Sequence, residues 1–401
     1  MERRWIHPNT ITGDAATKER YLRREHINEH FWREVRKGNH ILFVAPRRVG
    51  KTSIMRDLAE NCPPGFAGIY QNIEGVKSKK EFYQRLFTLI LQCIERSKVK
   101  KATVFVTDLF KRYSIKKIST AGLEFESSEP DYEKAIRDVI PELKKAELHT
   151  VIFLDEFAEV IHKLNKQGKA EDAIDILHML REMRSISDCK HFTLVYAGSI
   201  GLEFVIKNID RPKLINDLHR IIAAPLTDRE ASELIRQLTK GATIRISEDV
   251  LTYIKKKIDY LLPYYLQLML EEIDSVAYEN DQPVITIVMV ETAFQRVLSK
   301  RNNFEDWLER LKAYQSAFFS FINDILKHTA HKGTIATAEI HDKAIGFNRT
   351  DDYMDFVEQL IYDGYLVETG HLRYRFISPL LQQFWLTKYP VYESTPAILK
   401  S

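Results

Sequence analysis

Few cysteines and no long apolar run are the first features of this chain. Three cysteines occur in 401 residues, and they stand far apart, without the paired spacing of a zinc site. This scarcity argues against a disulfide-stabilised secreted domain and suits a reducing compartment. No apolar run reaches the ~18 residues that a membrane-spanning helix needs. The charged N-terminus lacks the apolar stretch of a signal peptide, so we expect a cytoplasmic protein without a membrane partner.

A large excess of one charge is also absent. Lys and Arg total 59 against 56 Asp and Glu, a net charge of +3, so the molecule as a whole is not expected to attract polyanions. Metal motifs are equally scarce. His26 and His30 have an i, i+4 spacing on a predicted helix, but they lack the glutamate of H-E-x-x-H and an obvious third ligand. The sequence therefore disfavours a metal at that pair.

One motif stands out against this ordinary background. An apolar run, residues 41–44, precedes it and an apolar helical pattern follows it, which is the strand–loop–helix context of a phosphate-binding loop. The motif consists of Ala45, Pro46, Arg47, Arg48, Val49, Gly50, Lys51, Thr52 and Ser53. In such loops, backbone N–H groups and the helix N-terminus bind a polyphosphate. We expect Lys51 to reach the outer phosphates and Thr52 to ligate Mg²⁺.

The first position of this motif departs from the usual pattern. The fingerprint G-x-x-x-x-G-K-[ST] begins with glycine, whereas this chain has Ala45. A positive φ would cost alanine ~1 kcal/mol or more, so we expect this turn to be built with negative φ. The alternative is a chance loop, and the correct flanks on both sides argue against it.

Two carboxylates follow a second apolar strand. Residues 150–154 are almost continuously apolar, as in a strand buried on both faces of a parallel sheet, and Asp155 and Glu156 come next. Ligands of such sheets bind at the carboxyl ends of the strands. We expect Asp155 to hold Mg²⁺, directly or through water, and Glu156 to polarise the attacking water. The alternative is that one of them only caps the following helix.

A third strand, residues 191–197, ends in a Gly198–Ser199 turn. Ser199 is a candidate for sensing the γ-phosphate or orienting the water. An ordinary turn serine is an equally good interpretation.

The order of elements predicts an α/β fold with two appended parts. We expect parallel strands at 41–44, 66–70, 150–154, 191–197 and 221–226, a hairpin within 114–126, and capping boxes at Ser78 and Thr227. After 226 the chain is helical to about 300; then helices at 307–330, 337–344 and 350–362 precede a hairpin at 365–376. This order predicts a parallel-sheet α/β domain with the phosphate-binding loop at 1–226, a helical domain at 227–302 and a winged helix domain at 303–401.

The third helix of the winged part carries the wrong charge for reading DNA. Residues 350–364 contain no Lys or Arg but include Asp351, Asp352, Asp355, Glu358 and Asp363. Phosphates repel carboxylates in a DNA groove. DNA binding through Arg349, Arg373 or Arg375 stays open, but protein packing is the favoured role of this helix.

The PRRVGKTS string at 46–53, the Leu154–Asp155–Glu156 strand end and the Gly198–Ser199 turn resemble the archaeal-type ATPases. These P-loop proteins are grouped with the MNS branch of the STAND NTPases and are close to the origin-recognition type of AAA+ ATPase. The resemblance implies that 1–226 is a P-loop (ASCE/AAA+-like) domain, that the helical domain at 227–302 is an α-helical lid, and that ATP is the nucleotide. It also implies that Arg24 flanks the adenine, that Arg220 faces a neighbouring subunit's γ-phosphate, and that Pro263 is the lid proline. Leu261 replaces the glycine of the family's G-x-P motif, a departure at this segment.

These features together predict an ATP-binding, Mg²⁺-dependent ATPase that acts as a conformational switch. We expect slow turnover and a role in a signalling or defence-type assembly, with a protein partner or self-association. The alternatives are an ATP-dependent DNA loader or transposition helper of origin-recognition type, and a nucleotide-bound scaffold without turnover.

Overall fold

The chain forms two compact units in a computed structural model. The first unit comprises Met1–Leu22, Pro46–Gly50 and Ala224–Ser401, and the second comprises Arg23–Ala45 and Lys51–Ala223. The residues that the structure describes are 5–97, 99–119, 122–186, 189–198, 201–209, 211–300, 302–314 and 318–392. The domain boundaries at 226 and 302 stay a prediction.

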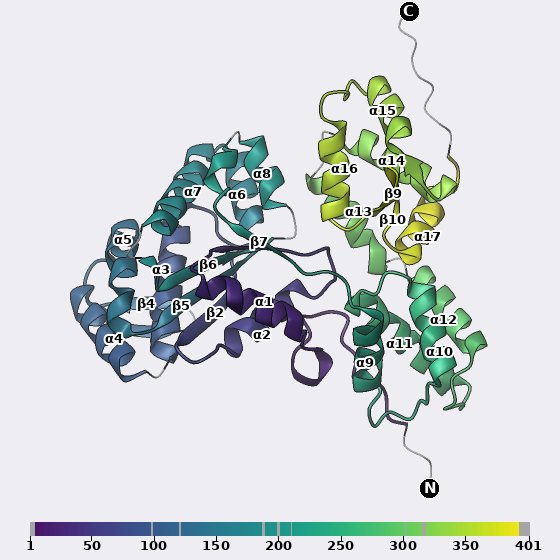
Figure 1. The fold of residues 1–401 in the computed structure, drawn as a ribbon, viewed down its shortest axis with the longest axis horizontal. Helices are drawn as coiled ribbons and strands as arrows, with labels where there is room; N and C mark the ends of the chain where they lie inside the picture. Colours follow the sequence, from purple (N-terminus) through teal and green to yellow (C-terminus); the bar gives the residue numbers. More distant parts are fainter. Residues whose placement is uncertain are drawn as a thin grey trace, which may run out of the picture. The chain divides into compact units, whose positions relative to one another are not determined.

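A five-stranded parallel sheet is the centre of the second unit (Figure 1). Its strands are β1 (Ile41–Val44), β2 (Phe66–Asn72), β5 (His149–Asp155), β6 (Phe192–Tyr196) and β7 (His219–Ile222). Their order is β2-β5-β6-β1-β7, and every neighbouring pair is parallel. Strands β1 and β6 are buried along their whole length, as expected for strands covered on both faces. The predicted α/β fold class is confirmed.

Helices surround this sheet, and a small hairpin is inserted among them. The helices are α1 (Glu25–Arg36), α2 (Lys51–Glu60), α3 (Lys79–Arg96), α4 (Lys100–Arg112), α5 (Tyr132–Glu142), α6 (Phe157–Lys166), α7 (Ala170–Ser185) and α8 (Leu202–Asn208), with 3-10 turns η2 (Leu143–Ala146) and η4 (Pro212–Leu214). Strands β3 (Ile115–Ser119) and β4 (Gly122–Phe125) pair antiparallel, which confirms the predicted hairpin. In Figure 1, α1 and α2 lie over one face of the sheet.

Helix α1 packs on the sheet because its apolar residues recur with helical spacing. Phe31 is fully buried, and its ring stacks on Phe153 of β5 with the centroids 5.5 Å apart. Trp32 contacts Phe66 of β2 edge-to-face at 5.3 Å. Helix α2 approaches β2 so closely that a Cβ on Gly68 would lie 2.9 Å from the backbone of Ala59. Glycine at residue 68 therefore allows this contact.

The predicted capping boxes form to different extents. Thr227 accepts a hydrogen bond from the Glu230 backbone N–H at 3.2 Å, and Glu230 accepts one from the Thr227 N–H at 2.8 Å. This box is complete. Ser78 accepts from the Glu81 N–H, but the Glu81 carboxylate accepts from the backbone N–H of Lys77 instead of Ser78, so the second box is only half formed.

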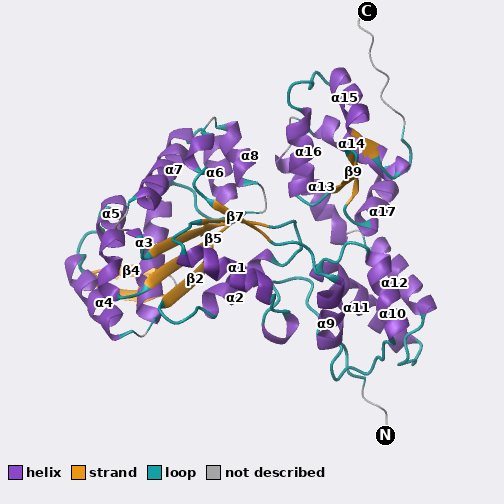
Figure 2. Cartoon of the chain, viewed as in Figure 1, coloured by secondary structure: helices purple, strands orange, loops and turns teal. Residues whose placement is uncertain are grey.

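The first unit is mainly helical. It contains η1 (Lys18–Arg20), α9 (Asp228–Leu238), α10 (Glu248–Ile258), α11 (Pro263–Glu279), α12 (Ile287–Ser299), α13 (Asn302–Tyr314), α14 (Phe319–Lys332), β8 (Ile335–Ala336), α15 (Thr337–Gly346), α16 (Tyr353–Tyr362), β9 (Leu366–Gly370), β10 (Arg373–Phe376) and α17 (Pro379–Lys388). Figure 2 shows the stretch from α9 to α12 as helices and loops. The antiparallel sheet β8-β10-β9, together with α14 to α16, gives the order of elements of a winged helix.

Two predicted elements were wrong in their bounds. The single helix expected at 307–330 is two helices, α13 and α14. The strand expected at 221–226 is β7 at 219–222, so Arg220 lies inside the strand rather than before it. The strand stops at Ile222 because its partner β1 ends opposite it, at Val44.

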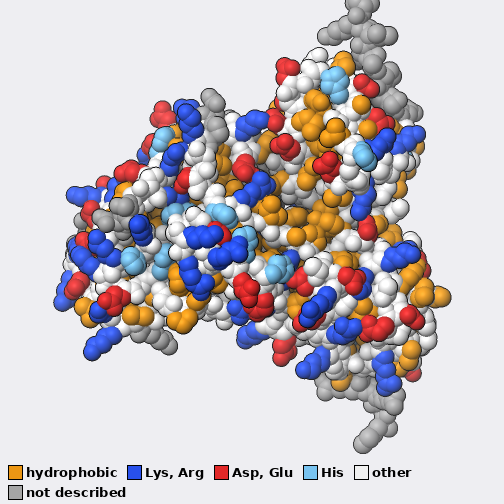
Figure 3. All heavy atoms as spheres, in the orientation of Figure 1, with side chains coloured by type: hydrophobic (Ala, Val, Ile, Leu, Met, Phe, Trp, Pro, Cys, Tyr) orange, Lys and Arg blue, Asp and Glu red, His pale blue; other side chains and the backbone are white. Residues whose placement is uncertain are grey.

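The surface is mixed in charge. On the face shown in Figure 3, Lys and Arg side chains alternate with Asp and Glu over most elements, in keeping with the small net charge. Every helix in the described ranges is too short or too polar to cross a bilayer.

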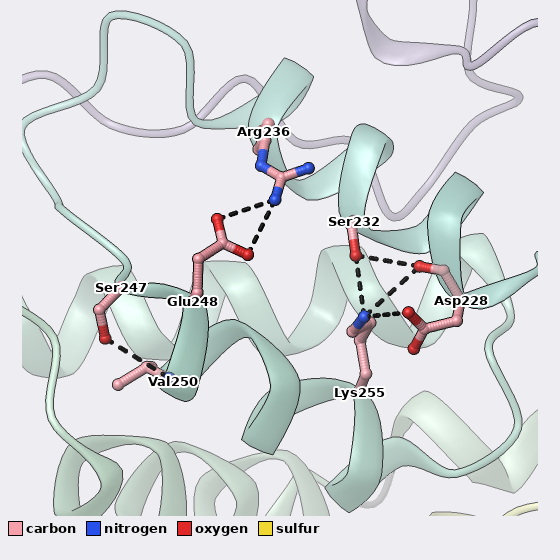
Figure 4. Close-up of polar contacts among 7 residues, drawn as sticks. All are labelled: Asp228, Ser232, Arg236, Ser247, Glu248, Val250 and Lys255. Atoms are coloured by element: carbon pink, nitrogen blue, oxygen red, sulfur yellow. Dashed lines mark hydrogen bonds and ion pairs between the residues drawn. The ribbon is translucent and has the colours of Figure 1, made fainter.

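The buried ammonium group of Lys255 on α10 contacts side chains of α9 (Figure 4). The Lys255 side chain is 8% exposed, and its Nζ lies 2.6 Å from Asp228 Oδ2 and 2.8 Å from Ser232 Oγ. The neighbouring pair Arg236–Glu248 joins the same helices at 2.8 Å, but both side chains are more than half exposed. Asp228 is itself 77% exposed, so the two pairs differ in the cation: Lys255 is buried and Arg236 is not. A buried charge that loses its partner is costly, so we expect the Lys255 pair to contribute more.

We predict that Asp228→Ala destabilises the protein by about 1–3 kcal/mol, because it leaves the Lys255 ammonium buried without a carboxylate. Glu248→Ala is the matched control, since Glu248 is also the first residue of a helix, and its loss should cost under about 1 kcal/mol. Urea unfolding of both variants measures the difference. Equal costs would show that burial of Lys255 has no energetic weight.

Candidate nucleotide site

Asp155, the last residue of β5, is the centre of the candidate site. Its carboxylate is 1% exposed. The Thr52 hydroxyl at the start of α2 donates to Asp155 Oδ2 at 2.8 Å, and the Tyr70 hydroxyl on β2 donates to the same oxygen at 2.9 Å. The structure therefore brings together the two residues that the sequence predicted as the Mg²⁺ ligands.

Lys51 supplies the positive charge beside this carboxylate. Its Nζ lies 3.1 Å from Asp155 Oδ1 and 3.8 Å from Glu156 Oε1. Burial by itself lowers the pKa of Lys51, but the charges of Asp155, Glu156 and Glu159 outweigh it, so the pKa lies above its ordinary value. Lys51 is therefore a cation at neutral pH.

Glu156 occupies a strained backbone position. Its φ is 62°, in the left-handed region, which costs a residue with a Cβ about 1–2 kcal/mol. It is the N-cap residue of α6, yet its side chain makes no capping hydrogen bond. The structure thus gives no support to the alternative that Glu156 only caps the helix, and such strain concentrates at functional sites.

Tyr70 is a site residue that the sequence analysis missed. It pairs with Phe153 in the β2–β5 register, which places its hydroxyl beside Asp155. Burial, followed by the nearby Asp155 charge, raises the pKa of Tyr70, so the phenol keeps its proton and donates. A tyrosine near the end of a predicted strand was the available signal, but it becomes informative only once β2 is known to neighbour β5.

The middle of the phosphate-loop motif belongs to the first unit. The Val49 backbone N–H donates to the Pro46 carbonyl at 3.4 Å, and Gly50 has a φ of 92°, which favours glycine. Arg48 has a positive φ of 67°, whereas Ala45 is not one of the described residues with positive φ. The expected negative φ at residue 45 is confirmed.

Aromatic side chains of the first unit contact the loop arginines. The Arg48 guanidinium lies 4.2 Å from the ring centroid of Tyr264, at the start of α11, and that of Arg47 lies 5.4 Å from Trp307 of α13. Both distances are in the range of cation–π attraction. Pro263, the expected lid proline, is the first residue of α11 and precedes Tyr264. The sequence did not predict either aromatic contact.

Four predicted residues remain, of which the structure describes three. Arg24 is buried at the N-cap of α1, and Ser53 is buried in α2. Arg220 on β7 lies 3.6 Å from Glu203, and both side chains are 46% exposed. Ser199 lies outside the described residues. Roles for these four residues stay predictions.

The donor set fits the group that the sequence implied. A carboxylate and a hydroxyl are the oxygen ligands that Mg²⁺ prefers, and Thr52 and Asp155 offer both within 2.8 Å of each other. Lys51 adds the cation that neutralises phosphate charge next to them. These residues can hold a Mg²⁺–polyphosphate.

Part of the second unit matches the model of a known family. The model of the family described as "ATPase family associated with various cellular activities (AAA)" matches residues 41–215. A Lon protease of Mycoplasma mycoides subsp. mycoides SC is 26% identical over 229 residues, which cover 55% of this chain and 26% of that protein. This chain spans about a quarter of that relative's length, so the protease as a whole is no guide to its activity.

Two solved structures are similar to this chain over most of its length. The Walker-type ATPase of Pyrococcus abyssi superposes with a TM-score of 0.61 at 15% identity, covering 94% of this chain and 99% of that one. The ORC2 protein of Aeropyrum pernix superposes with a TM-score of 0.47 at 11% identity, covering 92% of this chain and 94% of that one. At 15% identity, the similarity to the Pyrococcus structure concerns the fold alone, a parallel sheet with appended helices. The family model matches residues 41–215, which is less than half of the chain.

We predict that Gly50→Ala destabilises the loop by about 1–2 kcal/mol, because its φ of 92° suits glycine and not alanine. A Cβ at residue 50 would meet nothing within 4 Å, so backbone strain is the expected cause. Gly75→Ala is the control, since it is equally open but has no positive φ, and it should change stability by under about 0.5 kcal/mol. Urea unfolding measures the free energy of unfolding of both variants. Equal losses would contradict the expected backbone strain at residue 50.

Proposed function

We propose that this protein is an ATP-binding, Mg²⁺-dependent ATPase whose nucleotide state controls its C-terminal helical elements. One observation carries the proposal. The same short motif supplies Lys51 and Thr52 to Asp155 and supplies Arg47 and Arg48 to aromatic residues of the helical unit.

The residues of the second unit would divide the chemistry among them. Thr52 and Asp155 would hold Mg²⁺, which neutralises charge on the transferring phosphate when it is bound. Lys51 would exchange its ion pair with Asp155 for the phosphate oxygens. Glu156 would accept the proton of the attacking water.

The loop contacts would convert nucleotide binding into a conformational change. Phosphate oxygens would be held by the backbone N–H groups of residues 46–50, and the side chains of Arg47 and Arg48 leave from that same backbone. A change in the loop therefore changes how these arginines meet Trp307 and Tyr264, and segments ordered by a γ-phosphate are a common form of switch.

A protein partner, in a signalling or defence-type assembly, would receive this change. Arg220 is half exposed on the edge strand β7, 3.6 Å from Glu203. That position supports a role toward a second copy of the chain. DNA handling is the alternative, and two of the arginines that could serve it are paired with carboxylates: Arg349 with Asp352 at 3.1 Å and Arg375 with Asp259 at 2.8 Å.

We predict that the wild-type protein hydrolyses ATP only with Mg²⁺, and that two variants separate binding from turnover. Glu156→Gln should still bind ATP but lose turnover by a factor of ~10² or more, because it removes the general base. Lys51→Ala should lose ATP binding. Calorimetric titration and phosphate release measure the two steps.

Lys163→Ala and Glu171→Gln are the matched controls. Lys163 pairs with Glu74 and Glu171 lies in the first turn of α7, away from Asp155. Both should behave as wild type. Unchanged binding and turnover in Lys51→Ala and Glu156→Gln would refute the ATPase assignment, and a salt-sensitive gel shift that strengthens with ATP would favour the DNA alternative.

We further predict that ATP·Mg²⁺ changes amide hydrogen exchange in α11 and α13, because these helices carry Tyr264 and Trp307. The change should be absent in Lys51→Ala. Helix α4 of the second unit serves as the internal reference. If ATP changes hydrogen exchange at the loop but not in α11 or α13, the proposed switch is contradicted. The ATPase assignment would still stand.

A further inference from the structure

A second cluster of ligating side chains lies at α1 and β7. It consists of His30, Glu34 and His219, whose ligand atoms all lie within 4.8 Å of one another. His30 Nε2 is 3.8 Å from Glu34 Oε1, and His219 Nε2 is 3.8 Å from Glu34 Oε2. Two imidazoles and one carboxylate are a ligand set typical of zinc sites that keep a fourth position open.

The fold places this cluster at the opposite edge of the sheet from Asp155. His219 is the first residue of β7, and its N–H donates to the carbonyl of His40, just before β1. Asp155 is the last residue of β5. Because all five strands are parallel, a strand start and a strand end lie at opposite edges of the sheet. The cluster is therefore separate from the candidate nucleotide site.

Glu34 is the anchor of the cluster. Its side chain is 3% exposed, which is unusual for a glutamate on a surface helix. Lys37 Nζ and Arg33 Nε donate to Oε1 at 2.8 and 3.1 Å, and Asn39 Nδ2 donates to Oε2 at 3.0 Å. These three hydrogen bonds fix the direction of the carboxylate.

The two oxygens of Glu34 have different neighbours. Both cationic donors bind Oε1, whereas the donor on Oε2 is the neutral amide of Asn39. An oxygen with one neutral donor keeps a lone pair for a further ligand. Oε2 is also the oxygen nearest to His219. The hydrogen bonds thus orient the carboxylate in the way that outer partners orient metal ligands.

The histidines are accessible and can adjust. His30 is 40% exposed and His219 is 36% exposed, and their rings meet edge-to-face with centroids 5.9 Å apart. Figure 3 shows histidine side chains on the face where α1 lies. Ligand atoms bound to one tetrahedral zinc are ~3.3 Å apart by the usual bond lengths. Rotation of the exposed imidazoles would bring the ligand atoms of the three side chains to this distance.

We infer that His30, Glu34 and His219 form a binding site for a divalent transition metal of the zinc type, which links α1 to the edge strand β7. The sequence spacing paired His30 with His26, and the structure instead pairs it with Glu34 and His219. The inference does not depend on the proposed ATPase activity, because no nucleotide-site residue takes part in it.

Titration of the chelator-treated full-length protein with Zn²⁺ tests this site. Calorimetry should show one tight equivalent, and Co²⁺ should give the visible absorption of a tetrahedral complex. His219→Asn, His30→Asn and Glu34→Gln should each weaken Zn²⁺ binding at least ~10-fold. Zn²⁺ should raise the Tm of the wild type and not that of His219→Asn.

His26→Asn is the matched control, because His26 lies one helical turn before His30 on α1 and outside the cluster. It should bind Zn²⁺ as the wild type does. Wild-type binding by His219→Asn, or an equal loss in His26→Asn, would overturn the site. Circular dichroism checks that the variants fold, and His219→Asn changes a surface-accessible side chain, so it tests the site even if Glu34→Gln fails to fold.

Discussion

The buried carboxylate of Asp155 is the constraint on which the second unit depends. A buried charge without partners costs several kcal/mol, and here Thr52, Tyr70 and Lys51 supply two hydrogen bonds and an ion pair. These partners come from α2 and β2, so satisfying one charge fixes the start of α2 and the end of β2 relative to β5. The packing of α1 on β5 and β2 supports the same region from one face.

The same contacts explain how the site can be stable in the protein alone and still exchange the ion pair of Lys51 for Mg²⁺. Lys51 compensates Asp155 in the protein alone, and Mg²⁺ would compensate it equally well in a complex while Lys51 turns to phosphate. Each state then leaves no buried charge unpaired, so the exchange avoids the penalty that removing one partner alone would bring. A loop whose arginines also contact Tyr264 and Trp307 can pass this exchange on to helical elements, as the proposed switch requires.

Local sequence was enough for the parts of the site that depend on local geometry. A strand, a loop with Gly50 and Lys51, and a second strand ending in Asp155 are enough to predict that Thr52 meets Asp155, because parallel strands present their carboxyl ends at one edge. Tyr70 and His219 could not be predicted, because their roles depend on which strands become neighbours. The end of β7 could not be predicted from the apolar run 221–226, because it depends on where the partner strand β1 ends.

The amino and carboxyl edges of the sheet are connected through one strand pair, β1 and β7. Strand β7 pairs only with β1 in the sheet, with Arg220 opposite Leu42 and Ile222 opposite Val44, and β1 runs directly into the phosphate-loop motif. A metal at His219 would hold the start of β7, and through the β1 ladder it would steady the strand from which the loop begins. Edge strands are the least constrained strands of a sheet. An anchor at the amino edge would therefore act on an edge strand of this sheet, away from Asp155 at the carboxyl edge.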